Sequence, residues 1–205
     1  MVTQLNLKEI ERKAFRSTYE DGLWDLYYGL VVVGMSIFIY RPEAGYSPMN
    51  IILSTVIIGL SGALFWVGKK YITVPRMGQV KFGPERKQKA KRLAIILGGF
   101  VLFQAVLVGL TALGWTNLFD AGLLVVALIG SSILGTSMIV VAYFSDFPRG
   151  YYIAVLMALA VFLMIYANQP IYAILIGLAI IISGVALLVR FLKKYPKPDG
   201  TGSHG

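Results

Sequence analysis

The sequence predicts an all-α fold: a polytopic transmembrane helical bundle with six spans and both termini in the cytoplasm. Three observations lead there. Apolar residues make up 57% of the 205 residues and charged residues only 14%, whereas a soluble domain carries roughly a quarter charged residues. The apolar residues are gathered into six long blocks, and basic residues occupy alternate connections between the blocks.

Each of the six blocks approaches the length of about 20 apolar residues that a helix needs to cross a bilayer. The predicted spans are residues 23–40, 51–67, 93–115, 121–144, 151–167 and 171–192. Residues that favour turns separate them, such as Pro48, Pro84, Pro148 and the Asn168-Gln169-Pro170 run. Because that last turn is so short, a re-entrant hairpin in place of the last two spans remains the alternative topology.

The basic residues predict the orientation. Of the 19 Lys and Arg residues, all but Arg41 fall in the N-terminal segment, the connections after the second and fourth spans, and the C-terminal tail. Cytoplasmic loops carry an excess of Lys and Arg, and these four segments share one side only if the number of spans is even. We therefore expect both termini in the cytoplasm and the protein in the plasma membrane.

Three segments are expected along the chain. Residues 1–22 are predicted to form a cytoplasmic amphipathic helix, residues 23–192 the membrane domain, and residues 193–205 a disordered cytoplasmic tail. The N-terminal helix either lies on an anionic membrane surface or packs on the protein's own loops. In the basic loop, residues 69–92, extended alternation on both sides of Pro75 predicts a short β-hairpin at residues 71–82.

The first and last pairs of spans share a sequence pattern. Tyr27-Tyr28 and Tyr151-Tyr152 open the two pairs, and Lys-Lys-Tyr closes each, at residues 69–71 and 193–195. One interpretation is an ancient repeat of helical hairpins. The other is that membrane helices with interfacial Lys and Tyr resemble one another by constraint. Small residues, including Gly59, Gly62, Gly177 and Gly184, predict close helix packing in either case.

Several kinds of chemistry are not expected. The chain has no Cys and a single His, His204, which excludes disulfides, Cys/His zinc sites and bis-His haem within the chain. Neither a G-x-S-x-G elbow nor a Walker loop occurs, so we expect no metal, no cofactor and no catalytic residue, and the sequence argues against an enzyme. No nucleic-acid recognition fold fits in the basic loop.

Ionisable groups inside spans are the first place to look for function. Asp25 lies about one turn inside the first span, four residues after Asp21, and makes that span the weakest of the six. The two acids can line a cytoplasmic mouth, bind a cation or pair with Arg76 or Arg149. The alternative is that they only interact with a helix N-terminus. Gln104 can form interhelical hydrogen bonds with the Ser and Thr residues of the fourth span, or mark a transport path.

The basic loop is a candidate surface for lipid or a protein partner. Near an anionic leaflet each Lys or Arg contributes roughly 1 kcal/mol, although the loop can also serve only to enforce topology. The candidate lipid- or partner-binding residues are Lys69, Lys70, Lys81, Arg86, Lys87, Lys89, Lys91 and Arg92.

Two functional hypotheses follow. The first is a non-catalytic scaffold or accessory subunit, whose partners are the bilayer, anionic lipid head groups, and a protein bound at the loop or a second copy of the chain. The alternative is a small transporter or channel with a path near Asp25 and Gln104. Transport predicts a water-filled cavity that reaches one of these residues, and a scaffold predicts a dry bundle.

Overall fold

The computed structural model describes residues 19–39, 47–77, 84–113 and 122–196, and 91% of these residues are helical, with no strand among them. The predicted all-α membrane bundle is confirmed. The helices are α2 (Leu23–Ile39), α3 (Pro48–Gly68), the π-helix η1 (Lys69–Thr73), α4 (Val74–Met77), α5 (Pro84–Ala112), α6 (Leu123–Phe144), α7 (Pro148–Ala167) and α8 (Pro170–Lys194).

The helices match the predicted spans, with α2 as the shortest. Five helical runs are long and apolar enough to cross a membrane, and α3, η1 and α4 together form one of these runs. The remaining helix, α2, is apolar but only 17 residues long, in keeping with its status as the weakest predicted span. Of the helix predicted over residues 1–22, residues 19–22 form a turn before α2, and residues 1–18 lie outside the described residues, as does the tail beyond residue 196.

The predicted β-hairpin at residues 71–82 is wrong over its first half. Residues 71–77 are helical, in η1 and α4, and residues 78–83 lie outside the described residues. An isolated two-stranded hairpin is marginal in water, whereas extending α3 needs no new helix nucleus. The wider π turn lies just before Pro75, a residue that has no N–H to donate to a regular helical turn.

Proline residues mark the starts of helices, and a residue with a positive φ marks the end of α6. Four helices begin with proline, at Pro48, Pro84, Pro148 and Pro170. Proline suits the first position of a helix because its missing N–H would have no hydrogen-bond partner within the helix there. The α6–α7 turn is a Schellman motif: Phe147 N–H donates to Ala142 O at 2.9 Å, and Asp146 N–H donates to Tyr143 O at 3.3 Å. Asp146 itself has a φ of 48°, in the position that glycine usually takes.

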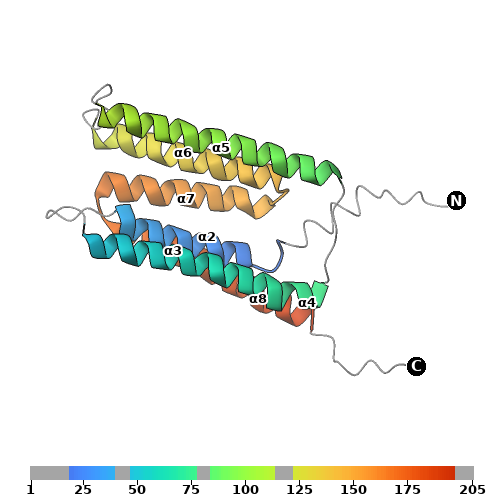
Figure 1. Ribbon diagram of the computed structural model, residues 1–205. Coiled ribbons are helices and arrows are strands. Elements are labelled where there is room, and N and C mark those ends of the chain that lie inside the picture. The colour runs from blue at the N-terminus through green and yellow to red at the C-terminus, as the bar shows by residue number, and fades with distance from the viewer. Residues whose placement is uncertain (1–18, 40–46, 78–83, 114–121, 197–205) are drawn as a thin grey trace, which may run out of the picture.

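The helices form a layered bundle (Figure 1). Helix α2 packs against α3 and α8, α7 packs against α6 and α8, and α5 lies against α6 at the outer edge. The apolar core lies between α2, α6, α7 and α8, and its most buried members include Ala127, Ile153, Met157 and Ile180. None of the most apolar stretch of α5 is buried. Outward-facing apolar surface of this extent is what a membrane-embedded helix requires.

Gly29 of α2 and two glycines of α8, Gly177 and Gly184, bring these helices together. A Cβ added at Gly29 would lie 2.9 Å from the carbonyl oxygen of Gly177, and one added at Gly184 would lie 2.8 Å from the backbone nitrogen of Leu26. The two backbones therefore approach as closely as small residues allow. Gly59 and Gly62, in contrast, face open space on α3, so the predicted close packing is wrong there within the described residues.

Candidate functional site

The ion pairs between described residues all lie at one end of the bundle, which we call the charged end. It is formed by the segment before α2, the start of η1, the starts of α5 and α7, the α6–α7 turn and the C-terminal end of α8. These elements meet at the same end of the molecule (Figure 1). The antiparallel succession of helices returns the chain to this end after each pair of spans.

Asp21 is fully buried and joins the start of α2 to η1. Its Oδ2 accepts hydrogen bonds from Lys69 Nζ and Thr73 Oγ1, both at 2.6 Å, and its Oδ1 accepts one from the Leu23 N–H at 3.1 Å. The carboxylate therefore satisfies a free N–H of the first turn of α2. It also neutralises Lys69, whose side chain is only 21% exposed. Gly22, with a φ of 73°, makes the turn between Asp21 and the helix.

Asp25 is the second buried acid, and the structure pairs it with Arg149. Arg149 Nη2 lies 3.3 Å from Asp25 Oδ2 and donates its hydrogen bond to the Tyr19 carbonyl oxygen. Arg149 thereby connects the start of α7 to the segment before α2 and to α2 itself. Arg76, the other candidate partner, instead donates to Ile72 O within its own helical segment, at 3.0 Å.

Asp146 and Glu20 are the other acids whose side chains the structure describes. Arg86 Nη1 lies 2.6 Å from Asp146 Oδ2, which connects the start of α5 to the α6–α7 turn, and Lys89 Nζ lies 4.0 Å from the same oxygen. Glu20 lies 3.6 Å from Lys194, and both side chains are more than half exposed. The first pair is largely withdrawn from water, whereas the second is a surface pair of small energetic consequence.

A layer of aromatic rings lies next to the ion pairs. The Tyr19 ring stacks between Trp24 and Phe147, with centroid distances of 5.4 Å and 4.9 Å, and Trp24 contacts Phe65 at 4.4 Å. Burial raises the pKa of Tyr19 above the usual value for a phenol, although a hydrogen bond with Ser145 opposes this shift. Tyr19 is therefore a neutral packing residue that joins the segment before α2 to the α6–α7 turn.

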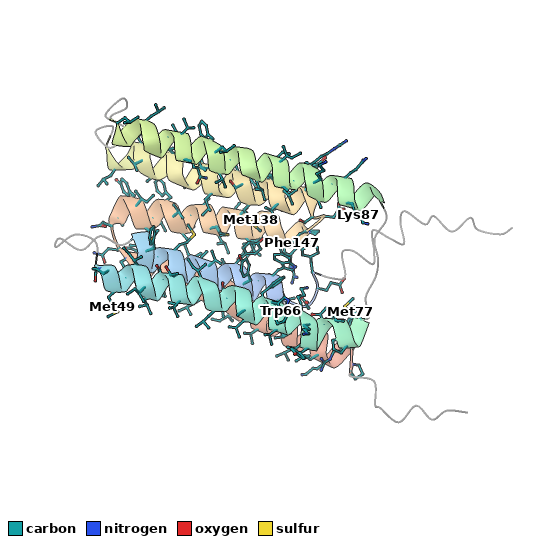
Figure 2. All side chains as sticks on the ribbon, in the orientation of Figure 1. Met49, Trp66, Met77, Lys87, Met138 and Phe147 are labelled. Atoms are coloured by element: carbon teal, nitrogen blue, oxygen red, sulfur yellow. The ribbon has the colours of Figure 1, made fainter. Side chains whose placement is uncertain are left out.

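The remaining basic candidates are mostly exposed. Lys70 Nζ lies 4.8 Å from the centre of the Trp66 ring, a cation–π contact. The exposed cations at the start of α5 are Lys87, Lys89, Lys91 and Arg92, of which Lys87 is labelled in Figure 2. Lys81 lies outside the described residues.

Gln104 is not brought to the polar residues of α6. Its side chain is exposed on α5. Ser131 and Ser137 donate to carbonyl oxygens of their own helix, to Leu128 O at 3.1 Å and to Ile133 O at 2.8 Å. In the described part of the chain, neither bond leaves α6, and no hydrogen bond connects Gln104 to that helix.

A pocket of about 350 Å³ opens at the charged end, between the start of α7 and the end of α8. It is lined by Glu20, Arg149, Leu187, Arg190, Phe191, Lys194 and Tyr195. Of these only Arg149 is a candidate from the sequence. The sequence nevertheless contained a signal, because the four lining residues of α8, and Tyr195 directly after it, recur at the three- and four-residue spacing that places side chains on one helix face.

The described residues contain no group of three or more His, Cys, Asp or Glu side chains able to hold a metal ion. Chemically, the charged end presents acids engaged by cations and a surplus of exposed cations, an arrangement suited to binding anions. No family model, curated protein or solved structure matches the chain.

Proposed function

We propose that this membrane protein is a non-catalytic scaffold or accessory subunit of the plasma membrane, whose charged end faces the cytoplasm and binds anionic lipid head groups. One observation carries the proposal. Glu20, Asp21, Asp25 and Asp146, the acids whose side chains the structure describes, each pair with a cation of the same chain. Among the described residues, the cations without such a pair are Lys70, Arg76, Lys87, Lys91, Arg92, Arg190 and Lys193.

The distribution of basic residues supports the cytoplasmic orientation. Every Lys and Arg in the described ranges lies within residues 69–92, at position 149 or within residues 190–194, which all belong to the charged end. An excess of Lys and Arg marks cytoplasmic loops, and the surface potential of that leaflet attracts such residues. A head-group-binding surface and a cytoplasmic orientation are therefore supported by the same charges.

The state of the buried acids favours a scaffold over a transporter. Asp21 is held by three hydrogen bonds, and freeing it for ion transfer would leave Lys69 as an uncompensated charge. Neither Asp25 nor Gln104 lines the pocket at the charged end. One observation favours the alternative: Asp25 Oδ2 is buried and accepts no hydrogen bond from the described residues, so transport through Asp25 is the competing function to test.

Proteoliposomes test both functions. We expect no proton or cation flux above that of empty vesicles, from the wild-type protein or from Asp25→Asn. We also expect greater thermal stability in vesicles that contain anionic phospholipid than in purely zwitterionic ones. Salt of about 1 M, which reduces the Debye length to roughly 3 Å, should remove the difference.

The outcomes separate the hypotheses. Flux that Asp25→Asn abolishes would overturn the scaffold and establish a transporter. Equal stability in the two kinds of vesicle would contradict a surface that binds anionic lipid.

A further inference from the structure

We propose that the pocket between the start of α7 and the end of α8 is a specific site for the phosphate group of an anionic membrane phospholipid. The inference rests on the proposed lipid-facing role of the charged end, and it goes further by naming the residues and the ligand group. Most of the other exposed cations are spread along α5, whereas this pocket concentrates charge in a defined volume of about 350 Å³.

The pocket is built on one face of α8. Leu187, Arg190, Phe191, Lys194 and Tyr195 follow the three- and four-residue spacing of a helix face, and Glu20 and Arg149 close the pocket from the segment before α2 and from α7. Phe191, which is 3% exposed, contacts the Tyr195 ring at 5.1 Å, and Lys194 Nζ lies 5.2 Å from the centre of the same ring. Tyr195 therefore helps to hold Lys194 at the pocket.

The charges in the pocket favour an anion. Three cations and one acid line the pocket. Arg149 pairs with Asp25 and Lys194 with Glu20, so the lining has one cation, Arg190, more than it has acidic partners among the described residues. The contacts with Asp25 and with the Tyr19 carbonyl oxygen hold the Arg149 side chain in one orientation. Part of that side chain remains exposed at the pocket. Arg190 forms no ion pair and no hydrogen bond within the described residues, and its planar guanidinium matches phosphate oxygens in pairs.

The apolar part of the pocket favours a lipid over a soluble phosphate. Leu187 and Phe191 form apolar lining between the cations. From Leu187, α8 runs back into an apolar stretch that is long enough to cross a membrane. A phospholipid can therefore place its phosphate on the cations and its acyl chains along α8, whereas a free phosphate would use only the charged part. Basic pockets at the cytoplasmic ends of membrane helices suit lipid head groups in this way.

Native mass spectrometry of the full chain in detergent, titrated with phosphatidylglycerol, tests the site. We expect Arg190→Gln and Lys194→Gln each to weaken binding by about fivefold, the effect of removing one cation near a phosphate. Lys193→Gln is the matched control, because it removes the same charge at the neighbouring position, which does not line the pocket. It should leave the dissociation constant nearly unchanged.

Glu20→Gln provides a result of opposite sign, which misfolding cannot mimic. Removing the one acid from the pocket frees Lys194 and should tighten binding severalfold. Equal weakening by Lys193→Gln and Lys194→Gln would overturn the proposal in favour of diffuse attraction. Displacement of the lipid by glycerol phosphate at similar concentration would overturn it in favour of a soluble anion.

The vesicle experiment distinguishes this inference from the proposed function. If the pocket variants bind lipid normally while anionic vesicles still stabilise the wild-type protein, the pocket is wrong and the lipid-facing role stands. If anionic lipid neither binds nor stabilises, both are wrong.

Discussion

Replacing Asp21 by asparagine tests whether the buried ion pair holds the charged end together. Asparagine has nearly the same shape as aspartate. Its one acceptor oxygen can keep the hydrogen bond from the Leu23 N–H, and its NH2 group can donate to Thr73 Oγ1 in place of the bond that the carboxylate accepted. It cannot neutralise Lys69, whose ammonium group lies 2.6 Å from the carboxylate and whose side chain is only 21% exposed. The substitution therefore isolates the charge from the packing.

The expected loss is large for a single charge. Removing one partner of a buried ion pair costs about 3–5 kcal/mol, because the other charge stays buried without compensation. The hydrogen bonds that asparagine retains, and the partial access of Lys69 to water, reduce that loss to about 2–4 kcal/mol in the free energy of unfolding. Glu20→Gln is the matched control: its pair with Lys194 is more than half exposed on both sides, so we expect a loss below about 1 kcal/mol.

Equilibrium unfolding in mixed micelles measures the difference, with the fluorescence of Trp24, which packs beside this network, as the signal. A second variant sharpens the result: in Asp21→Asn combined with Lys69→Met no charge remains buried, so part of the lost stability should return. If Asp21→Asn is no more destabilising than Glu20→Gln, or if the double variant is the sum of its parts, the ion pair does not stabilise the fold.

Three further predictions concern packing, helix attachment and pH. Gly29→Ala should destabilise the bundle by about 1–3 kcal/mol, because its Cβ would lie 2.9 Å from a carbonyl oxygen of α8; Gly59→Ala, in open space on α3, should be neutral or stabilise by up to about 1 kcal/mol. Arg86→Gln removes the contact with Asp146 at 2.6 Å, so hydrogen exchange should quicken in the first turns of α5 and stay unchanged in α2. The raised pKa of Tyr19 means that its contribution to stability is complete below about pH 10 and is lost as the pH rises through the folded-state pKa. The difference in unfolding free energy between wild type and Tyr19→Phe should therefore shrink at alkaline pH, and a constant difference would contradict it.

The bundle itself was predictable because each helix carries its own signal. Length and apolar composition identify the spans, and prolines such as Pro48, Pro148 and Pro170 mark where helices begin. All of these are local properties of the sequence. The basic segment after α3 was misjudged because its alternation suggested strands at residues 71–77, while the cost of starting a hairpin in isolation outweighs that pattern.

The charged end was only partly predictable, because its contacts depend on how distant segments meet. Arg149 was one of two candidate partners for Asp25, and the geometry of the α6–α7 turn decides between them. The contact between Asp21 and Lys69 joins residues 48 positions apart and depends on the placement of α2 against α3. The three- and four-residue spacing of the pocket residues on α8 can be recognised in the sequence. The cations among them, however, are equally expected in a segment that only sets the orientation of the protein in the membrane.

The gathering of ion pairs at one end has a mechanical consequence. In the described residues, the helices are tied by charge and hydrogen bonds at the charged end, whereas no ion pair lies at the opposite end. Apolar contacts are non-directional and allow small changes of tilt, whereas hydrogen-bonded ion pairs fix distance and angle. When the thickness of the surrounding bilayer changes, the helices should splay or close at the opposite end and pivot about the charged end. The charged end would then keep its shape in membranes of different composition.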